Sequence, residues 1–330
     1  RQPFKLMRTP DEHGLDKVEA MKQNYYKLRL DCLVILGGNG TQKTANLLRE
    51  EGLNIIHLPK TIDNDLCETD HTPGFGSAAK YIASSLLEIA HDTFIYAVKS
   101  VTIVEIMGRD AGWLTAASAL ARNGYNTAPH LIYLPEVPFD KEDFLLDVKR
   151  MLFERNNVIV AVSEGIRDAS GNYISASESS VDTFGHSQLS GAGKTLEFLV
   201  KEKLGVKVRS VEVNVLQRCA AHLASKTDLD EAFTLGQKAV ALSEEDVTAS
   251  MVTMRRISDA PYEISYEHAE IRHIANEAKS IPREWINDAG NDVTQPLIDY
   301  LSPLILGEVP VKYENGIPVY MDVSHLAKHQ

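Results

Sequence analysis

The sequence predicts an α/β protein, a doubly wound fold in which parallel strands are covered by helices on both faces. Three observations predict this class. Short runs rich in β-branched residues alternate with longer helical runs along the chain. The first predicted strand, residues 32–36, is apolar throughout, which is typical of a strand buried on both faces. Several strands end in glycine or polar turns that lead directly into a helix.

The predicted elements follow in a regular order. The first strand ends in a glycine turn, and a helix then runs from Thr41 to a stop at Gly52. Further helices are predicted after Trp113 and over residues 141–154 and 194–203. The remaining predicted strands are residues 54–58, 101–106, 130–134, 158–162 and 208–216. Ligands of open parallel sheets bind beyond the carboxyl ends of the strands, so the residues just after each strand are the candidates for a site.

Composition excludes several classes of protein. The chain has 330 residues, 44% hydrophobic and 24% charged, which indicates a globular protein of about two domains. Its net charge of −12 argues against nucleic acid and anionic membranes as partners. The three cysteines are too few and too far apart for a disulfide framework, and no apolar stretch reaches the ~18 residues needed to span a bilayer. We therefore expect a cytoplasmic protein.

The first candidate segment is the turn Gly37-Gly38-Asn39-Gly40-Thr41. Glycines let the backbone approach a ligand closely, and free N–H groups at a helix start favour an anion such as phosphate. A tight strand-to-helix turn without a ligand is the alternative interpretation, and the turn alone does not decide between the two.

The second candidate segment, residues 59–65, holds Asp63 and Asp65 beside Lys60 and Thr61. A phosphoryl transferase needs a carboxylate to accept the proton of the attacking hydroxyl and another to hold Mg²⁺. It also needs a cation on the phosphate, which Lys60 offers. The alternative is a solvated Asp/Asn turn.

Arginines form a third group of candidates. Met107-Gly108-Arg109 leaves a strand, and Arg109 presents a fork that matches the oxygens of a phosphate. Arg209 and Arg218 fall on one predicted strand segment, where their odd spacing places them on opposite faces unless a bulge intervenes. Surface salt bridges are the alternative for each arginine taken singly.

Two attractive motifs are rejected. Residues 190–195 end like a P-loop, but Gln188 stands where that pattern requires glycine, so we expect a polar loop and the start of a helix. His268 and His273, placed in a predicted helix, are five residues apart and do not share a face as metal ligands would. A nicotinamide-dependent dehydrogenase is excluded because no G-x-G-x-x-G follows a strand.

Taken in order, the segments GGNGT, PKTIDND, SVTIVEIMGRDAGW, AVSEGI and NVLQR resemble the phosphofructokinase family over essentially the whole chain. The resemblance implies two Rossmann-like domains, with residues 1–74 and about 217–290 binding the donor and residues 75–216 and about 291–330 binding the sugar. It also implies Mg²⁺-dependent phosphoryl transfer from ATP or pyrophosphate to the 1-hydroxyl of fructose 6-phosphate, which gives fructose 1,6-bisphosphate in glycolysis.

The resemblance also assigns roles. Asp63 is implied as the catalytic base, assisted by Thr61 and Arg109. The metal is implied to lie at Asp65 and Asn39. Arg209 is implied to reach across a subunit interface, which predicts a homodimer or homotetramer. The implied contacts to fructose 6-phosphate are Thr61, Asp63, Met107, Gly108, Arg109, Glu164, Arg209 and Arg218, and those to the donor are Gly38, Asn39, Gly40, Thr41 and Lys60.

The donor depends on two residues with opposite implications. Gly40 is typical of ATP-using members, because a side chain there would crowd the nucleotide, whereas Lys60 and the segment from Cys67 onward are typical of pyrophosphate users. We expect ATP on the steric argument, with pyrophosphate as the alternative. A second alternative is a non-catalytic regulatory member. This second alternative is motivated by Asn39 and Val215. It is also motivated by the family's first strand and glycine loop, which we expect to precede Arg1.

Overall fold

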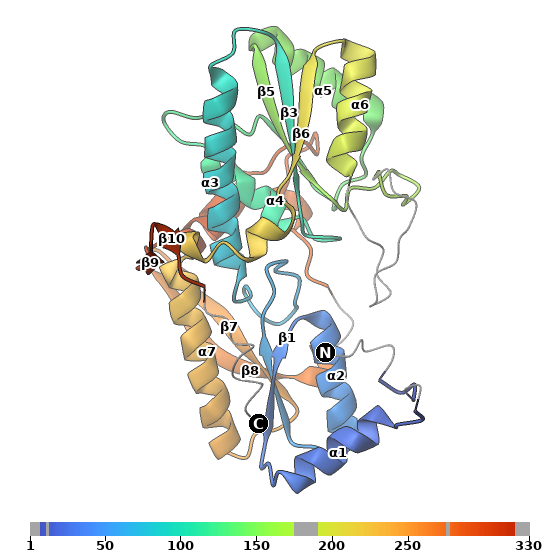
Figure 1. Ribbon diagram of the computed structural model, residues 1–330, viewed down its shortest axis with the longest axis vertical. Coiled ribbons are helices and arrows are strands. Elements are labelled where there is room, and N and C mark those ends of the chain that lie inside the picture. Colours follow the sequence, from blue (N-terminus) through green and yellow to red (C-terminus); the bar gives the residue numbers. More distant parts are fainter. Residues whose placement is uncertain (1–6, 11–12, 175–190, 275–277, 321–330) are drawn as a thin grey trace.

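The computed structural model describes residues 7–10, 13–174, 191–274 and 278–320, which form two lobes stacked along the long axis (Figure 1). The helices are α1 (Lys17–Lys27), α2 (Asn39–Glu50), α3 (Phe75–Phe94), α4 (Trp113–Ala117), α5 (Lys141–Glu154), α6 (Ala192–Leu204), α7 (Lys226–Glu244), α8 (Ile271–Ile274) and α9 (Gln295–Leu301). Short 3₁₀ helices are η2 (Ser118–Ala121), η3 (Asn214–Arg218), η4 (Ala221–Leu223), η5 (Arg283–Trp285) and η6 (Ser302–Ile305). The strands are β1 (Leu33–Gly37), β2 (Ile55–Pro59), β3 (Ser100–Ile106), β4 (Leu131–Tyr133), β5 (Asn157–Ser163), β6 (Lys207–Glu212), β7 (Ser250–Asp259), β8 (Tyr262–Glu270), β9 (Tyr313–Glu314) and β10 (Ile317–Pro318).

The upper lobe contains a fully parallel sheet in the order β4-β5-β3-β6. Side chains of β3 alternate between its two faces. Val101 and Ile103 pack with residues of α5 and α6, whereas Val104 and Ile106 pack with residues of α3 and α4. Every residue of β3 is buried, because helices cover both faces. The doubly wound arrangement predicted from the sequence is confirmed in this lobe.

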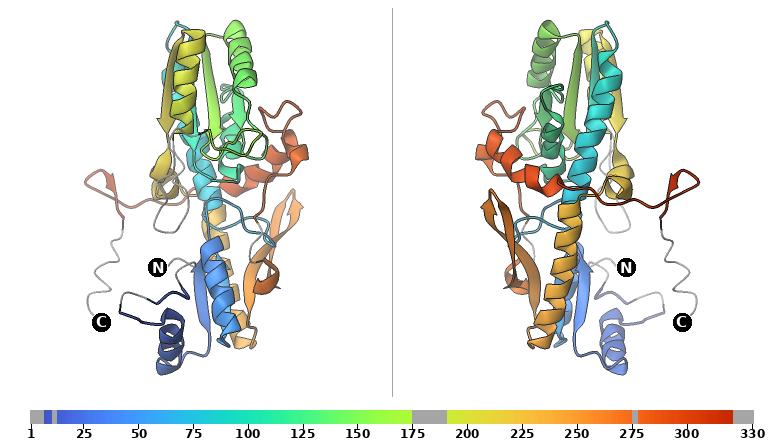
Figure 2. Two further views of the ribbon diagram at one scale, coloured as in Figure 1. Left: turned by 90° about the vertical axis from the view of Figure 1, so that its right-hand side faces the viewer. Right: turned by 90° about the vertical axis from the view of Figure 1, so that its left-hand side faces the viewer.

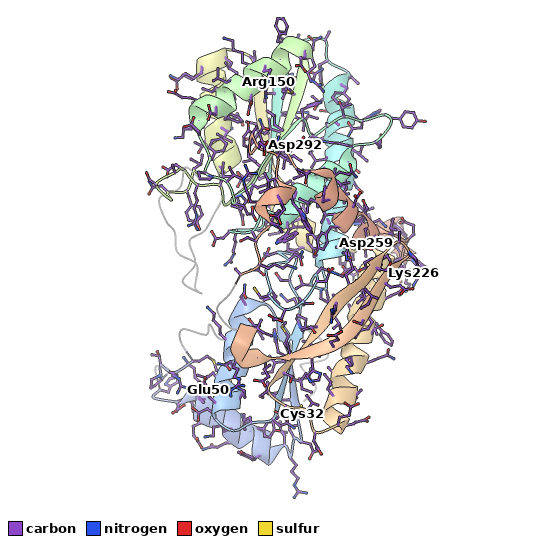
Figure 3. The ribbon with its side chains drawn as sticks, turned by 180° about the vertical axis from the view of Figure 1, so that it is seen from behind. Cys32, Glu50, Arg150, Lys226, Asp259 and Asp292 are labelled. Carbon is purple, nitrogen blue, oxygen red and sulfur yellow. The ribbon has the colours of Figure 1, made fainter. Side chains whose placement is uncertain are left out.

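The lower lobe contains the sheet β1-β2-β7-β8, in which β8 alone runs antiparallel. Its core is divided in the same way: Ile55 packs with α1 and α2 on one face, and Ile56 packs with α7 on the other. Figure 2 shows the resulting layers from both sides. The β7–β8 hairpin runs from the far end of the lobe, near Cys32, toward the junction, where Asp259 stands near its tip (Figure 3).

Two details of the strands differ from the sequence predictions. The first strand is not buried on both faces: Leu36 is 63% exposed and Val34 is 37% exposed, because α7 packs on β2, β7 and β8 and leaves this face of β1 open. The last predicted strand ends at Glu212, because the chain turns into η3 two residues later. Arg218 therefore lies on a turn.

The hairpin over residues 250–270 was not predicted. Its pairing joins residues close in sequence, but the pattern lacks a simple alternation of apolar and polar residues. His268 consequently lies exposed on β8 and not in a helix. Other predictions agree closely: α5 has the predicted bounds because the Asp140 side chain accepts from the N–H groups of Glu142 and Asp143 and fixes its start.

The carboxyl ends of the parallel strands in both lobes point toward the junction (Figure 1). Gly37 pairs with Pro59 at the end of the lower strands, and Ile106 pairs with Ser163 at the end of the upper ones. The turns that follow these strands therefore face one another between the lobes. Among the residues that the structure describes, no helix is long and apolar enough to cross a bilayer.

Candidate active site

The segment after β2 forms a compact turn around Thr61. The N–H of Asp63 donates to Thr61 Oγ1, and that hydroxyl donates to Asp63 Oδ2, each over 3.1 Å. Asn64 adopts a left-handed conformation (φ 54°) and is fully buried. Its amide turns to Tyr300, away from the two flanking aspartates. The turn thus separates the buried asparagine from Asp63 and Asp65.

The aspartate pair is electrostatically strained. Burial raises the pKa of Asp63, and the positive charges of Arg109, Lys60 and Arg218 oppose that rise. Burial and the nearby charge of Asp63 raise the pKa of Asp65 to about 6. Two half-buried carboxylates that repel each other form a site suited to a cation or a proton.

The glycine turn after β1 lies directly beside this pair. Gly38 is the N-cap of α2, and Asn39 Nδ2 donates to Asp65 Oδ2 over 2.6 Å. The N–H of Lys60 donates to the carbonyl of Gly37 over 3.1 Å. A side chain at Gly37 would collide with Thr41, since its Cβ would lie 2.1 Å from Oγ1. The first two predicted segments therefore meet.

On the opposite side stands the turn after β3. Glu164 Oε1 accepts from the N–H groups of Gly108 (3.3 Å) and Arg109 (3.1 Å). These bonds hold Gly108 at φ 153° and Arg109 at φ 53°. Gly165 is required here, because a Cβ would lie 1.6 Å from the carbonyl of Arg109. Burial raises the pKa of Glu164 to about 7. Met107 precedes this turn at the end of β3.

The two remaining arginines are placed differently. Arg218 lies on η3, and its charge reaches Asp63. Arg209 pairs with Thr102 of β3, four residues before the carboxyl end of that strand, and binds Asp92 over 2.6 Å. The structure thus brings Arg218 to the other predicted residues, and within one chain it does not bring Arg209 there.

The residues present fit a magnesium ion whose coordination shell is completed by oxygen atoms of the substrate. Among the described residues, no group of three or more His, Cys, Asp or Glu side chains could hold a metal alone. Mg²⁺ commonly binds one or two protein carboxylates together with substrate phosphates and water. Asp65 supplies a carboxylate, and a contact from Asn39 would come through Oδ1, because Nδ2 points to Asp65.

Sequence reasoning missed the polar network behind the turn. Lys279 donates to Asn64, and Asp70 binds both His71 (2.7 Å) and Arg256 (3.1 Å). His71 is buried and also contacts Glu231 over 2.6 Å. The partners come from distant parts of the chain, so no local motif indicates them.

The rejection of the P-loop-like segment agrees with the structure. Helix α6 begins at Ala192, and Glu105 accepts from the N–H groups of Gly191 (3.0 Å) and Gly193 (2.7 Å) at its start. A carboxylate of this chain therefore occupies the position that a phosphate would take. Ser190, Gln188 and the loop before them lie outside the described residues.

Two doubly wound lobes that bring a glycine turn, an aspartate pair and an arginine turn to their junction define an α/β phosphotransferase. The family model for phosphofructokinase matches residues 4–243. The chain belongs to the phosphofructokinase family, as the sequence motifs predicted, and it is an enzyme of that family.

Three similar proteins illustrate the relationship. The chain is 43% identical over 292 residues to a pyrophosphate–fructose 6-phosphate 1-phosphotransferase of Halomonas elongata, covering 87% of this chain and 69% of the relative. It is 39% identical over 208 residues to an ATP-dependent 6-phosphofructokinase of Spirochaeta thermophila, covering 63% of this chain and 55% of the relative. A crystal structure of a pyrophosphate-dependent phosphofructokinase from Nitrosospira multiformis matches with a TM-score of 0.82 and 34% identity, covering 92% of this chain and 75% of that one.

Proposed function

We propose that this chain transfers a phosphoryl group from pyrophosphate to the 1-hydroxyl of fructose 6-phosphate. The observation that carries the proposal is the 43% identity, over 87% of this chain, to an enzyme named for that donor. The expectation of ATP from Gly40 is given up. A missing side chain removes an obstacle to a nucleotide, but it equally admits a smaller donor, so the steric argument works in one direction only.

In this proposal the two aspartates have different roles, one as the catalytic base and the other as a ligand of the metal. Asp63 accepts the proton of the attacking hydroxyl, and its raised pKa makes it a better base than an exposed carboxylate. Mg²⁺, held near Asp65 and Asn39, would neutralise charge on the donor. Lys60, exposed beside the glycine turn, supplies a positive charge to the terminal phosphate. The donor backbone contacts come from Gly38, Asn39, Gly40 and Thr41.

The sugar phosphate binds on the opposite side of the junction. The turn of Met107, Gly108 and Arg109 contacts the sugar, and Arg218 binds its 6-phosphate. Glu164 uses one oxygen to hold the turn. Its other oxygen takes a sugar hydroxyl. Donor and acceptor thus approach Asp63 from different lobes, and most of the rate comes from their alignment and from charge neutralisation.

The two lobes carry the two substrates. We assign residues 1–74 and about 217–290 to the donor domain, since β1, β2, β7 and β8 share one sheet. Residues 75–216 and about 291–330 form the sugar domain. In support, α9 packs with α3 and α4 in the core of the upper lobe.

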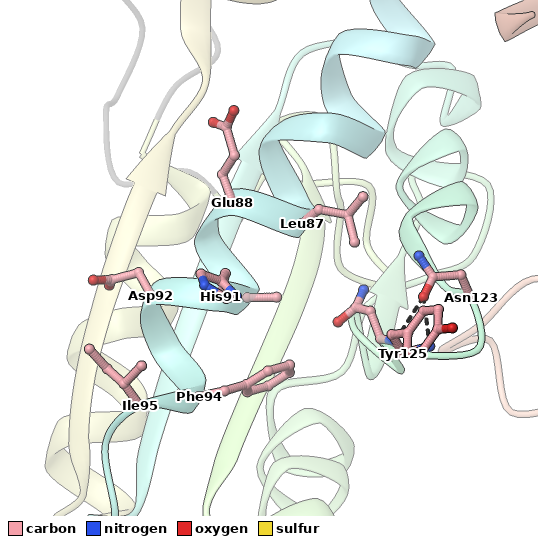
Figure 4. A pocket seen from close by; sticks show the side chains of 10 residues that line it. Leu87, Glu88, His91, Asp92, Phe94, Ile95, Asn123 and Tyr125 are labelled. Atoms are coloured by element: carbon pink, nitrogen blue, oxygen red, sulfur yellow. Dashed lines mark hydrogen bonds between the residues drawn. The ribbon is translucent and has the colours of Figure 1, made fainter.

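A second copy of the chain completes the sugar site. The end of α3 and the turn near Tyr125 line an apolar hollow of about 840 Å³ (Figure 4). Phe94 and Ile95 are 44% and 71% exposed there, and Tyr125 is fully exposed. Asp92, which binds Arg209, belongs to the same hollow. We assign this face to a homo-oligomer in which Arg209 reaches the partner's sugar phosphate.

The test compares donors directly. Purified protein is incubated with fructose 6-phosphate, Mg²⁺ and either pyrophosphate or ATP, and fructose 1,6-bisphosphate is measured. The proposal expects product with pyrophosphate and at least tenfold less with ATP. Product with ATP alone would restore the argument from Gly40. Binding of fructose 6-phosphate without product from either donor would favour the non-catalytic alternative.

A further inference from the structure

Lys279 lies behind the aspartate pair, in the segment between α8 and η5. Its ammonium group donates to Asn64 Oδ1 (3.2 Å) and to the carbonyls of Thr69 (3.2 Å) and Asp70 (2.5 Å). All three acceptors belong to the stretch that follows β2. The lysine therefore ties the side chain of Asn64 to the backbone of Thr69 and Asp70.

The backbone of Lys279 connects the two sides of the site. Its N–H donates to the carbonyl of Asp65, and its carbonyl accepts from Trp113 Nε1, each over 2.9 Å. Trp113 is the first residue of α4, four positions after Arg109. One residue thus contacts the aspartate turn and the helix that follows the arginine turn.

Asn64 is the residue that this anchor holds. Its backbone is left-handed (φ 54°), a conformation that asparagine tolerates better than most residues, and its buried side chain is fixed at both ends. Asn64 Oδ1 accepts from Lys279, and its Nδ2 donates to the hydroxyl of Tyr300 over 3.2 Å. These contacts hold the asparagine inward and leave Asp63 and Asp65 on the substrate side.

We propose that Lys279 is a positioning residue for phosphoryl transfer, whose ammonium group fixes the turn of Asp63 and Asp65 by holding Asn64, while its backbone joins that turn to α4. The inference rests on the proposed function. Lys279 acts through the turn, because its ammonium group donates to Asn64, Thr69 and Asp70 and to none of the residues on the sugar side of the junction. Its loss should therefore lower kcat and spare the KM for fructose 6-phosphate.

The test compares Lys279→Met with Lys80→Met. Lys80 is a matched control, because its half-buried ammonium also donates to a backbone carbonyl (Gly307, 2.7 Å) and to Glu308 (2.9 Å), away from the site. Misplacement of reacting groups by about 1 Å costs ~100-fold in rate. We expect Lys279→Met to lose about that factor in kcat, with a KM for fructose 6-phosphate within about twofold, and Lys80→Met to keep its kcat. An unchanged kcat in Lys279→Met would overturn the proposal.

Two further measurements separate positioning from general instability. Hydrogen exchange should rise at residues 61–72 in Lys279→Met and not in Lys80→Met, and this result is independent of turnover. The milder Lys279→Gln serves if the methionine variant does not fold. In a double-mutant cycle, Asn64→Ala should add little to Lys279→Met. Additive losses of kcat in the double mutant, or unchanged hydrogen exchange at residues 61–72 in Lys279→Met, would contradict the proposal that Lys279 anchors Asn64. A wild-type protein inactive with both donors would refute the proposed function alone.

Discussion

Asn39 donates a hydrogen bond from Nδ2 to Oδ2 of Asp65 over 2.6 Å and joins the glycine turn after β1 to the aspartate turn after β2. The bond forms because β1 and β2 are neighbours in the sheet, so their carboxyl ends lie side by side. It gives a strained carboxylate a neutral partner. The charge of the residue at position 39 therefore controls the electrostatic repulsion around Asp65.

We predict that Asn39→Asp makes stability depend more on Mg²⁺. Two carboxylates at this distance cannot both stay ionised without a cation. The melting temperature without Mg²⁺ should fall, and its increase on adding Mg²⁺ should exceed that of the wild type. Asn39→Ala, which removes the hydrogen bond and adds no charge, is the control. Equal shifts in all three proteins would show that position 39 does not sense the metal.

Replacing the base should separate catalysis from binding. Asp63→Ser keeps a small polar side chain beside Thr61 but removes the proton acceptor. We expect kcat to fall by about 10²- to 10⁴-fold, the usual contribution of general base catalysis. Calorimetry should give a dissociation constant for fructose 6-phosphate within a few-fold of the wild type. Near-normal turnover would assign the base to another residue.

The donor preference should depend on Lys60. A hydrogen bond to a charged group contributes about 1.5–3 kcal/mol, or roughly ten- to a hundredfold. Lys60→Met should lower kcat/KM for pyrophosphate by that factor and leave the KM for fructose 6-phosphate nearly unchanged. Lys149→Met, on the exposed face of α5, is the matched control. If both variants behave alike, Lys60 has no specific contact with the donor.

The sequence predicted those parts of the site that follow from local pattern. The glycine turn, the aspartate turn and the arginine turn each stand directly after a strand, and parallel strands bring such turns to one edge. Lys279 could not be found in this way. It lies 215 residues from Asn64, and its neighbours Ala278 and Ser280 are exposed, so no periodicity marks it as a contact.

Strand boundaries were harder to predict where tertiary contacts decide them. The apolar run through Leu216 suggested one long strand, but pairing with β3 ends at Glu212. The chain then needs a turn to carry Arg218 toward Asp63. Likewise, the apolar residues of β1 suggested cover on both faces, and only the position of α7 shows that Leu36 is exposed.

Stability should respond to pH through Glu164. Burial raises its pKa to about 7, from an ordinary value of 4.5. Between these pH values the folded protein holds a proton that the unfolded chain has released, so this group costs stability as pH rises. Glu164→Gln keeps an acceptor for the arginine turn and does not titrate. Relative to wild type, it should gain on the order of 3 kcal/mol in unfolding free energy between pH 4.5 and pH 8. The same difference in unfolding free energy between Glu164→Gln and the wild type at both pH values would contradict this prediction.

Assembly should depend on the exposed face at the end of α3. A charge introduced by Phe94→Asp would be desolvated against a second copy, so sedimentation should show smaller species. Phe153→Asp, at a 90% exposed phenylalanine on α5, is the control and should leave the mass unchanged. Arg209→Ala should keep the assembly and raise the KM for fructose 6-phosphate, since the exposed pair with Asp92 is weak enough to exchange for a phosphate of the partner site. A monomeric wild type with full activity would exclude any role for Arg209 across an interface.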